Sequence, residues 1–220
     1  GSIYIAWREF TNPSDPSAVH SILFVRSTDG GKSFSKAAAI DTALRPFDQG
    51  TSSGSFRSNA YPTMAVDGSG RIYVAWAARG FGSFRPDPIT GDARIVMAVS
   101  EDGGKTFRQV YQLSGDKFRV TALWKEDAWL YVFGAGKYRQ SSVCLARIET
   151  GRIRDRSAIR YFSGTDEDGA ARWSVQERDA AFLFRHEVVG EHSVAYCPTV
   201  GRYVMLYNSS APRGIVMRSA

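Results

Sequence analysis

Two copies of one short string determine the fold prediction for this chain: STDGGKSF at residues 27–34 and SEDGGKTF at residues 100–107. Each string is typical of a tight turn between two β-strands. The Asp accepts hydrogen bonds from turn amides, the glycines allow positive φ, and the Phe anchors the strand that follows. One such turn carries little information. Two that share their flanking pattern, with starts 73 residues apart, indicate an internal repeat.

The rest of the chain repeats a strand pattern at a similar interval. Short aromatic and β-branched runs alternate with turn residues, and no helical period is sustained. Four runs resemble one another and contain tyrosines at positions 4, 73, 131 and 203, which are separated by 69, 58 and 72 residues. This interval is about the size of one four-stranded propeller blade with its loops. The sequence therefore predicts an all-β fold, a β-propeller of four-stranded antiparallel blades.

The predicted strands form two complete blades and two incomplete ones. The complete blades use residues 63–66, 71–76, 94–99 and 109–113, then 120–124, 129–133, 143–148 and 159–162. The first blade begins at its second strand, and the last has strands at 194–197, 203–207 and 215–218. We expect four to five blades per closed ring. Three arrangements fit the incomplete blades. The chain is a segment of a larger propeller, it closes its ring in an unusual way, or it forms a homo-oligomer whose copies share blades through exposed edge strands.

The two halves of the chain resemble different propeller families. The repeated turns resemble the Asp box, or bacterial neuraminidase (BNR) repeat, of sialidase-like β-propellers. Past about residue 117, a set of motifs resembles the secreted actinobacterial family that includes endo-D-arabinan hydrolases. These motifs are WLYVFGAGKYRQSSVCLARI (129–148), YFSG (161–164), Trp173, GEHSVAY (190–196) and IVMRSA (215–220).

Together these resemblances imply propeller blades of one type at residues 1–116 and of another at 117–220, within one continuous domain. A divergent natural protein and a chimera of propeller segments joined near residues 113–117 both fit this pattern. The resemblances also imply a carbohydrate-active function and a secreted or periplasmic origin, although no signal peptide is visible in this sequence.

Composition narrows the classes of partner. The formal charge of +6 would suit an anionic ligand, yet the basic residues are spread along the chain and no nucleic-acid motif is present, so we expect no nucleic-acid partner. No apolar run approaches the ~18 residues that cross a bilayer, so we expect no membrane partner. We expect a glycan or another polar small molecule as ligand, with no cofactor and no metal. Cys144 and Cys197 are free thiols or a disulfide.

Propeller geometry separates the structural turns from the ligand loops. Both Asp boxes lie between the third and fourth strands of a blade, on the face away from the usual ligand site. We therefore expect structural roles for Ser27, Asp29, Gly31, Phe34, Ser100, Asp102, Gly104 and Phe107. The long connections of the opposite face carry the predicted ligand-binding residues Arg57, Arg79, Arg139, Trp173 and His192.

Aligning the repeats on their tyrosines selects a candidate site. Ten residues before three of the tyrosines stands a small hydroxyl residue, and two residues earlier stand Tyr61, Arg119 and Glu191. The strand period of two places these three side chains on corresponding faces, at the mouth of the channel. A buried polar network that ties blades together is the alternative interpretation.

We predict a catalytic set of Glu191, Glu177, Arg119 and Tyr61. Glu191 would act as general acid or base, Arg119 would hold the ligand, and Tyr61 would stack or donate a hydrogen bond. Glycoside hydrolysis normally uses two carboxyl groups, and Glu177 is one possible partner for Glu191. The predicted function is therefore a glycoside hydrolase-like propeller. A non-catalytic glycan-binding module and an inactive partial propeller that self-associates are the alternatives.

Overall fold

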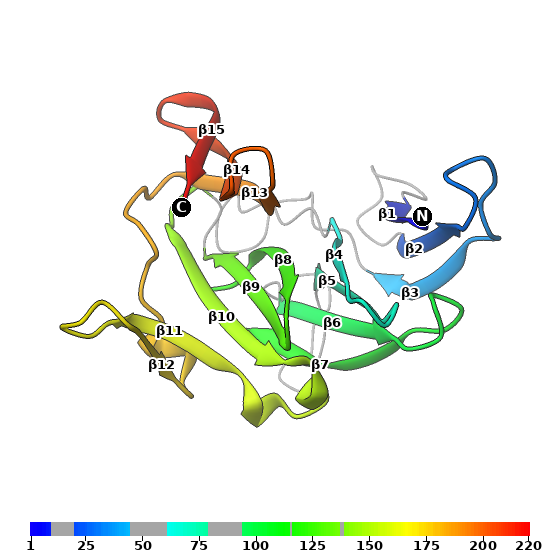
Figure 1. Cartoon of the computed structure of the whole chain (residues 1–220), viewed down its shortest axis with the longest axis horizontal. Helices are drawn as coiled ribbons and strands as arrows, with labels where there is room; N and C mark the ends of the chain where they lie inside the picture. Colours follow the sequence, from blue (N-terminus) through cyan, green and yellow to red (C-terminus); the bar gives the residue numbers. More distant parts are fainter. Residues whose placement is uncertain (10–19, 45–60, 79–93, 115, 137–138) are drawn as a thin grey trace. The chain divides into compact units, whose positions relative to one another are not determined.

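The computed structural model describes residues 1–9, 20–44, 61–78, 94–114, 116–136 and 139–220. These residues form fifteen β-strands and three short 3₁₀ helices (Figure 1). The strands make four antiparallel sheets, which correspond to four β-propeller blades, so the predicted all-β propeller class is confirmed. The chain divides into two compact units, residues 1–112 and 113–220.

Unit 1 contains two sheets, each built from strands consecutive in sequence. A three-stranded sheet has the order β1-β2-β3, and a four-stranded sheet has the order β4-β5-β6-β7. Their bounds are β1 Ile3–Glu9, β2 His20–Ser27, β3 Ala38–Leu44, β4 Thr63–Val66, β5 Ile72–Ala78, β6 Arg94–Ser100 and β7 Arg108–Ser114. Every residue of β5 is buried, as expected for a short uninterrupted apolar run.

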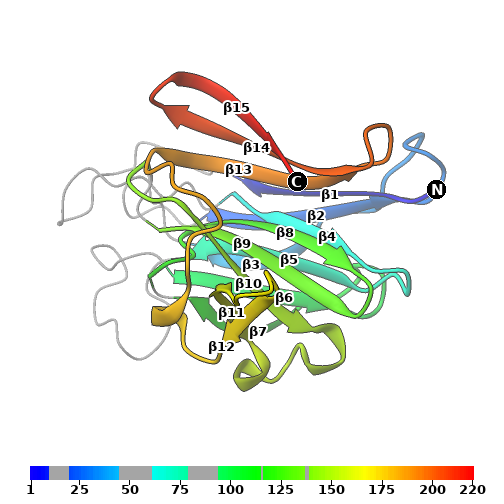
Figure 2. The same ribbon diagram turned by 60° about the vertical axis from the view of Figure 1, so that its left-hand side comes forward.

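Unit 2 contains a five-stranded sheet and a three-stranded sheet. The five-stranded sheet has the order β12-β11-β10-β9-β8, and the second has the order β13-β14-β15, which Figure 2 shows as consecutive antiparallel strands. Their bounds are β8 Val120–Glu126, β9 Trp129–Ala135, β10 Val143–Glu149, β11 Arg160–Thr165, β12 Ala171–Ser174, β13 Val189–Cys197, β14 Arg202–Ser210 and β15 Arg213–Ser219.

The prediction of four strands per blade is right only for β4 to β7. The other sheets have three, five and three strands. The extra strand is β12, which pairs with β11 across a register shift between Phe162 and Gly164. Its sequence, ARWS, is only four residues long and alternates two apolar with two polar residues, so it lacks the longer apolar run that predicts the other strands.

The core of unit 2 joins its two sheets. Ala135 at the end of β9, Val143 at the start of β10 and Val189 at the start of β13 are buried in one cluster with Met205 and Tyr207 of β14. Because β13 also packs against β8, the first residues of β8 and β13 and the last of β9 lie at one end of the unit.

Candidate functional site

A β-bulge at the start of β13 is the main irregularity at this end of unit 2. The register between β13 and β14 shifts between Val189 and His192. Two residues of β13, Gly190 and Glu191, therefore lie opposite a single residue of β14, Asn208. Bulges of this kind bend the strand and redirect a side chain, and they occur often beside active sites. The bulge gives Glu191 a direction that regular pairing would not.

The carboxylate of Glu191 contacts the strand on the far side of the bulge. Its Oε2 atom accepts a hydrogen bond from Nδ2 of Asn208 at 3.4 Å, and both side chains are half-buried. A carboxylate beside an amide combines strong acceptors with a donor. This pair can bind hydroxyl groups and can exchange a proton with a bound ligand.

His192 holds the bulge against the neighbouring sheet. Its Nδ1 lies 3.2 Å from the carbonyl oxygen of Gly190, and its Nε2 lies 3.2 Å from that of Phe133 in β9. Burial lowers the pKa of His192 below its ordinary value, and this effect outweighs the two carbonyls, which favour the protonated ring. The neutral ring carries one N–H, so it donates to one carbonyl at a time.

Two arginines lie in segments next to strands at this end of unit 2, one before β8 and one between β9 and β10. Arg119 directly precedes β8, and its main-chain N–H donates to the carbonyl of Ala135 at 2.8 Å. Its guanidinium lies 3.7 Å from the carboxylate of the exposed Asp116. Arg139 has a positive φ of 54°, and its N–H donates to the carbonyl of Val189 at 2.9 Å. The backbone thus brings both arginines to the end of unit 2 that holds the bulge.

Glu177 fixes the segment that leads into Arg119. Its Oε1 accepts hydrogen bonds from the Ser114 hydroxyl, from the N–H of Lys117 at 2.8 Å and from the N–H of Asp116 at 3.3 Å. The Lys117 ammonium in turn donates to two carbonyls of the Glu177 segment, each at 2.7 Å. In this arrangement the carboxylate organises a turn. Its predicted catalytic role stays a prediction.

The other predicted site residues lie in different places. Trp173 of β12 stacks on the guanidinium of Arg147, whose carbon lies 3.9 Å from the Trp173 ring centroid and 4.2 Å from that of Trp129. Tyr61 belongs to unit 1, where it precedes β4 with 56% of its surface exposed. Arg57 and Arg79 lie outside the described residues.

The two Asp boxes form the same hydrogen-bonded turn between strands, β2 to β3 and β6 to β7. Asp29 accepts from the hydroxyl of Ser27 at 2.7 Å and from the N–H and hydroxyl of Ser33 at 3.0 and 2.6 Å. Asp102 accepts from Ser100 at 2.8 Å and from the N–H and hydroxyl of Thr106 at 3.0 and 2.6 Å. These bonds lower the pKa of both carboxyls.

The turns differ in how they are anchored. In each, the serine hydroxyl also accepts a glycine N–H at 2.8 Å, from Gly31 in the first turn and from Gly104 in the second. Phe107 packs edge-on against Phe24, with ring centroids 5.1 Å apart. Phe34, expected to anchor its strand, is 44% exposed.

Sequence reasoning selected Glu191 but missed the bulge and Asn208. Asn208 directly follows the strand predicted at residues 203–207, yet nothing in its own sequence context indicates that it faces Glu191. Cys144 and Cys197 are free thiols. Among the described residues, no group of three or more His, Cys, Asp or Glu is placed to hold a metal ion. In the same part of the chain, no helix is long and apolar enough to span a membrane.

Comparison with protein families gives one match. The family described as "Domain of unknown function (DUF4185)" matches residues 91–220. This match includes the second Asp box and crosses residues 113–117, the predicted joint between two propeller lineages, so it gives the chimera alternative no support. No curated protein matches the chain in sequence.

Solved structures with the same fold cover nearly all of this chain. A protein of unknown function from Dyadobacter fermentans has a TM-score of 0.59 at 17% identity over 100% of this chain and 57% of its own. The GH43_1 enzyme from Xanthomonas citri, solved with xylotriose, has a TM-score of 0.56 at 16% identity, and the match covers 100% of this chain and 67% of that enzyme. The NanB sialidase of Streptococcus pneumoniae has a TM-score of 0.50 at 11% identity, and the match covers 94% of this chain and 26% of that sialidase. The chain therefore spans between about a quarter and two thirds of these structures.

Proposed function

The chain belongs to the DUF4185 family, and we propose that the protein is a glycoside hydrolase whose glycan site is the β13 bulge. Glu191 acts there as the general acid or base. The observation that carries this proposal is the bulge itself, which sets the Glu191 carboxylate beside the Asn208 amide at the end of a sheet. The fold supports it, because the chain is structurally similar at low identity to glycoside hydrolase propellers.

The pair at the bulge suits a ligand rich in hydroxyls. Glu191 supplies acceptors and Asn208 supplies both a donor and an acceptor, and the backbones of Arg119 and Arg139 lie at the same end of unit 2, where a guanidinium would add planar donors. A sugar ring presents hydroxyl groups that donate and accept, so each of these side chains has a complementary partner. Among the structures with this fold, the Xanthomonas citri enzyme was solved with xylotriose, a sugar.

Glu177 has a supporting role in this proposal. Glycoside hydrolysis normally requires a second carboxyl group. It lies about 5–5.5 Å from the first in retaining enzymes and about 6.5–9.5 Å from it in inverting enzymes. Glu177 already accepts three donors from residues 114–117. We therefore assign it to positioning Arg119. Substituting each remaining acidic residue by its amide would identify the second carboxyl group by its effect on kcat.

The test measures glycan cleavage by the full chain. Purified protein is incubated with arabinan, xylan and sialylated glycans, and released sugars are separated by chromatography. Glu191→Gln is expected to lower kcat by about 10²–10⁴-fold, the contribution of one general acid or base. Glu167→Gln, on the exposed turn between β11 and β12, is the matched control and should retain wild-type activity. Equal Tm values for both variants would exclude misfolding as the cause.

Two results would overturn the proposal that the protein is a glycoside hydrolase. One is the absence of product from every glycan at high enzyme concentration. The other is a Glu191→Gln variant as active as the control. If a glycan binds without being cleaved, and Glu191→Gln binds it equally well, the protein is a glycan-binding module.

A further inference from the structure

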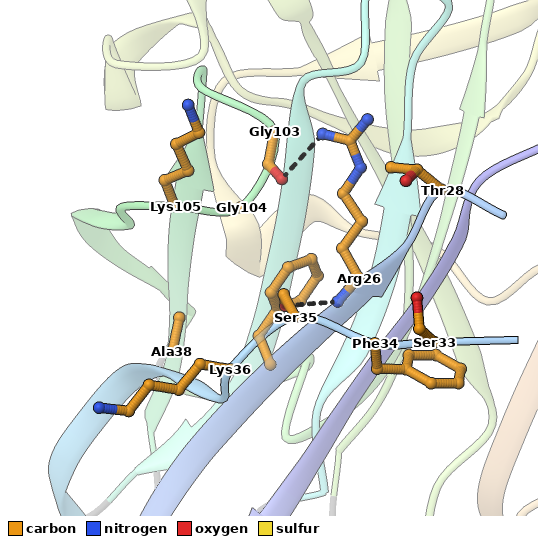
Figure 3. A pocket seen from close by; sticks show the side chains of 11 residues that line it. Arg26, Thr28, Ser33, Phe34, Ser35, Lys36, Ala38, Gly103, Gly104 and Lys105 are labelled. Carbon is orange, nitrogen blue, oxygen red and sulfur yellow. Dashed lines mark hydrogen bonds between the residues drawn. The ribbon is translucent and has the colours of Figure 1, made fainter. Parts of the chain in front are cut away.

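A groove lies in unit 1, between the two Asp-box turns. Figure 3 shows that it is formed where the β2–β3 turn approaches the β6–β7 turn, and its volume is about 570 Å³. The sequence predicts a purely structural role for these turns. The lining residues of their groove all belong to unit 1, whereas the residues of the β13 bulge belong to unit 2.

Three cations line this groove. They are Arg26 at the end of β2, Lys36 after the first Asp box and Lys105 within the second. Among the described lining residues there is no Asp or Glu. The nearby carboxylates of Asp29 and Asp102 each accept several hydrogen bonds from their own turns. The groove lining therefore carries three positive charges, and the two carboxylates beside it keep their negative charge while their oxygens accept hydrogen bonds from their own turns.

Arg26 is held in place before any ligand binds. Its Nη1 atom donates a long hydrogen bond of 3.5 Å to the carbonyl of Gly103, which links the two turns (Figure 3). Its guanidinium carbon also lies 5.7 Å from the centroid of the Tyr4 ring. These two weak contacts orient the guanidinium, and its planar donors match carboxylate and sulfate groups.

The remaining lining residues suit a sugar that carries such a group. Thr28, Ser33 and Ser35 place hydroxyl-bearing side chains along the groove, and the Phe34 ring is 44% exposed at its edge. An exposed aromatic ring offers a flat apolar surface to the face of a sugar ring.

We propose that this groove binds an acidic glycan, a polysaccharide bearing carboxylate or sulfate groups. Arg26 and the two lysines contact the anionic groups, and Phe34 packs against a sugar ring. The groove lies in unit 1 and does not involve Glu191. It would hold an acidic polymer on the protein independently of any cleavage at the β13 bulge.

The test compares binding of four probes to the full chain at low salt by titration calorimetry. Polygalacturonate carries carboxylates, heparin carries sulfates, arabinan is neutral, and single-stranded DNA is an anionic polymer without the sugar pattern. Lys36→Ala/Lys105→Ala should weaken binding of polygalacturonate or heparin about tenfold, because each lost contact removes one charge pair. The acidic probe that binds more tightly identifies the anionic group.

The control removes the same charge elsewhere. Lys32→Ala/Lys125→Ala deletes one lysine of the first Asp box that does not line the groove and one lysine of unit 2. Its affinity should stay within about threefold of wild type, because only general attraction is reduced. Equal losses in both double variants would overturn the proposal. So would DNA binding as tight as that of the acidic glycans, or no binding of either acidic glycan.

Discussion

The Asp boxes of unit 1 and the β13 bulge of unit 2 use their carboxylates in opposite ways. In each Asp box the carboxylate is satisfied by its own turn, through a serine two residues before it and the N–H and hydroxyl of the residue four after it. At the bulge, Glu191 reaches across to Asn208 of the next strand. The carboxylate of each Asp box is thus bound by its own turn and builds that turn, whereas the bulge directs the carboxylate of Glu191 to a partner on another strand.

The largest effect is expected when a glycine of an Asp-box turn is replaced by alanine, which adds one methyl group to the turn. Gly104 has φ +89°, and a Cβ there would stand 2.1 Å from the Phe24 ring. Gly31, its equivalent in the first box, has φ +93°, but its Cβ would meet only the tip of Ile3 at 3.1 Å. Gly104→Ala should cost about 3–4 kcal/mol through strain and overpacking, and Gly31→Ala about 1–2 kcal/mol through strain alone.

Urea denaturation followed by tryptophan fluorescence measures both glycine variants. The glycan affinity of folded Gly31→Ala should be unchanged, because Gly31 does not line the groove. Equal destabilisation by the two substitutions would show that backbone conformation, rather than packing against Phe24, sets the cost. The difference between the two turns would then have no energetic consequence.

The succession of strands other than β12 can be predicted from the sequence, but their register cannot. The apolar run of β5 and the repeated tyrosines specify strands locally, because burial of alternate or continuous apolar residues depends on nearby sequence. The bulge at Glu191 depends on how β13 pairs with β14. Glu177 accepts hydrogen bonds from donors 60 and 61 residues earlier in the chain. Local patterns carry no record of such contacts, so Glu177 was predicted from its residue type alone.

Acid titration separates the two regions by pH. His192 has a lowered pKa in the folded chain, so its neutral form stabilises unit 2 above the ordinary pKa of 6.5, and this contribution is lost as pH falls below that value. Asp29 and Asp102 also have lowered pKa values, so their contribution is complete above the ordinary pKa of 3.8 and is lost only as pH falls further.

Two variants test which residues cause these two losses of stability. The Tm of each is measured from pH 8 down to pH 3. His192→Gln should flatten the decline that begins below about pH 6.5, because glutamine does not titrate and can still donate to one carbonyl. Asp29→Asn/Asp102→Asn should flatten the decline below about pH 4 and leave the first step unchanged. If His192→Gln leaves the upper step intact, His192 is not the group that titrates there.

The smallest expected effect concerns a carboxylate of unit 2 that is structural. Tyr203 of β14 donates its phenol hydrogen to Glu126 of β8 and so ties the two sheets of the unit together; this bond raises the pKa of Tyr203 to about 12. Tyr203→Phe should cost about 1 kcal/mol in urea denaturation, the value of one such hydrogen bond, whereas Tyr196→Phe should cost less. Neither should change glycan cleavage. Because Glu191→Gln is expected to do the reverse, lowering cleavage at constant stability, the two substitutions together decide whether carboxylates of this unit divide into structural and functional groups. A loss of cleavage in Tyr203→Phe would show that the tie between the sheets also sets the geometry of the bulge.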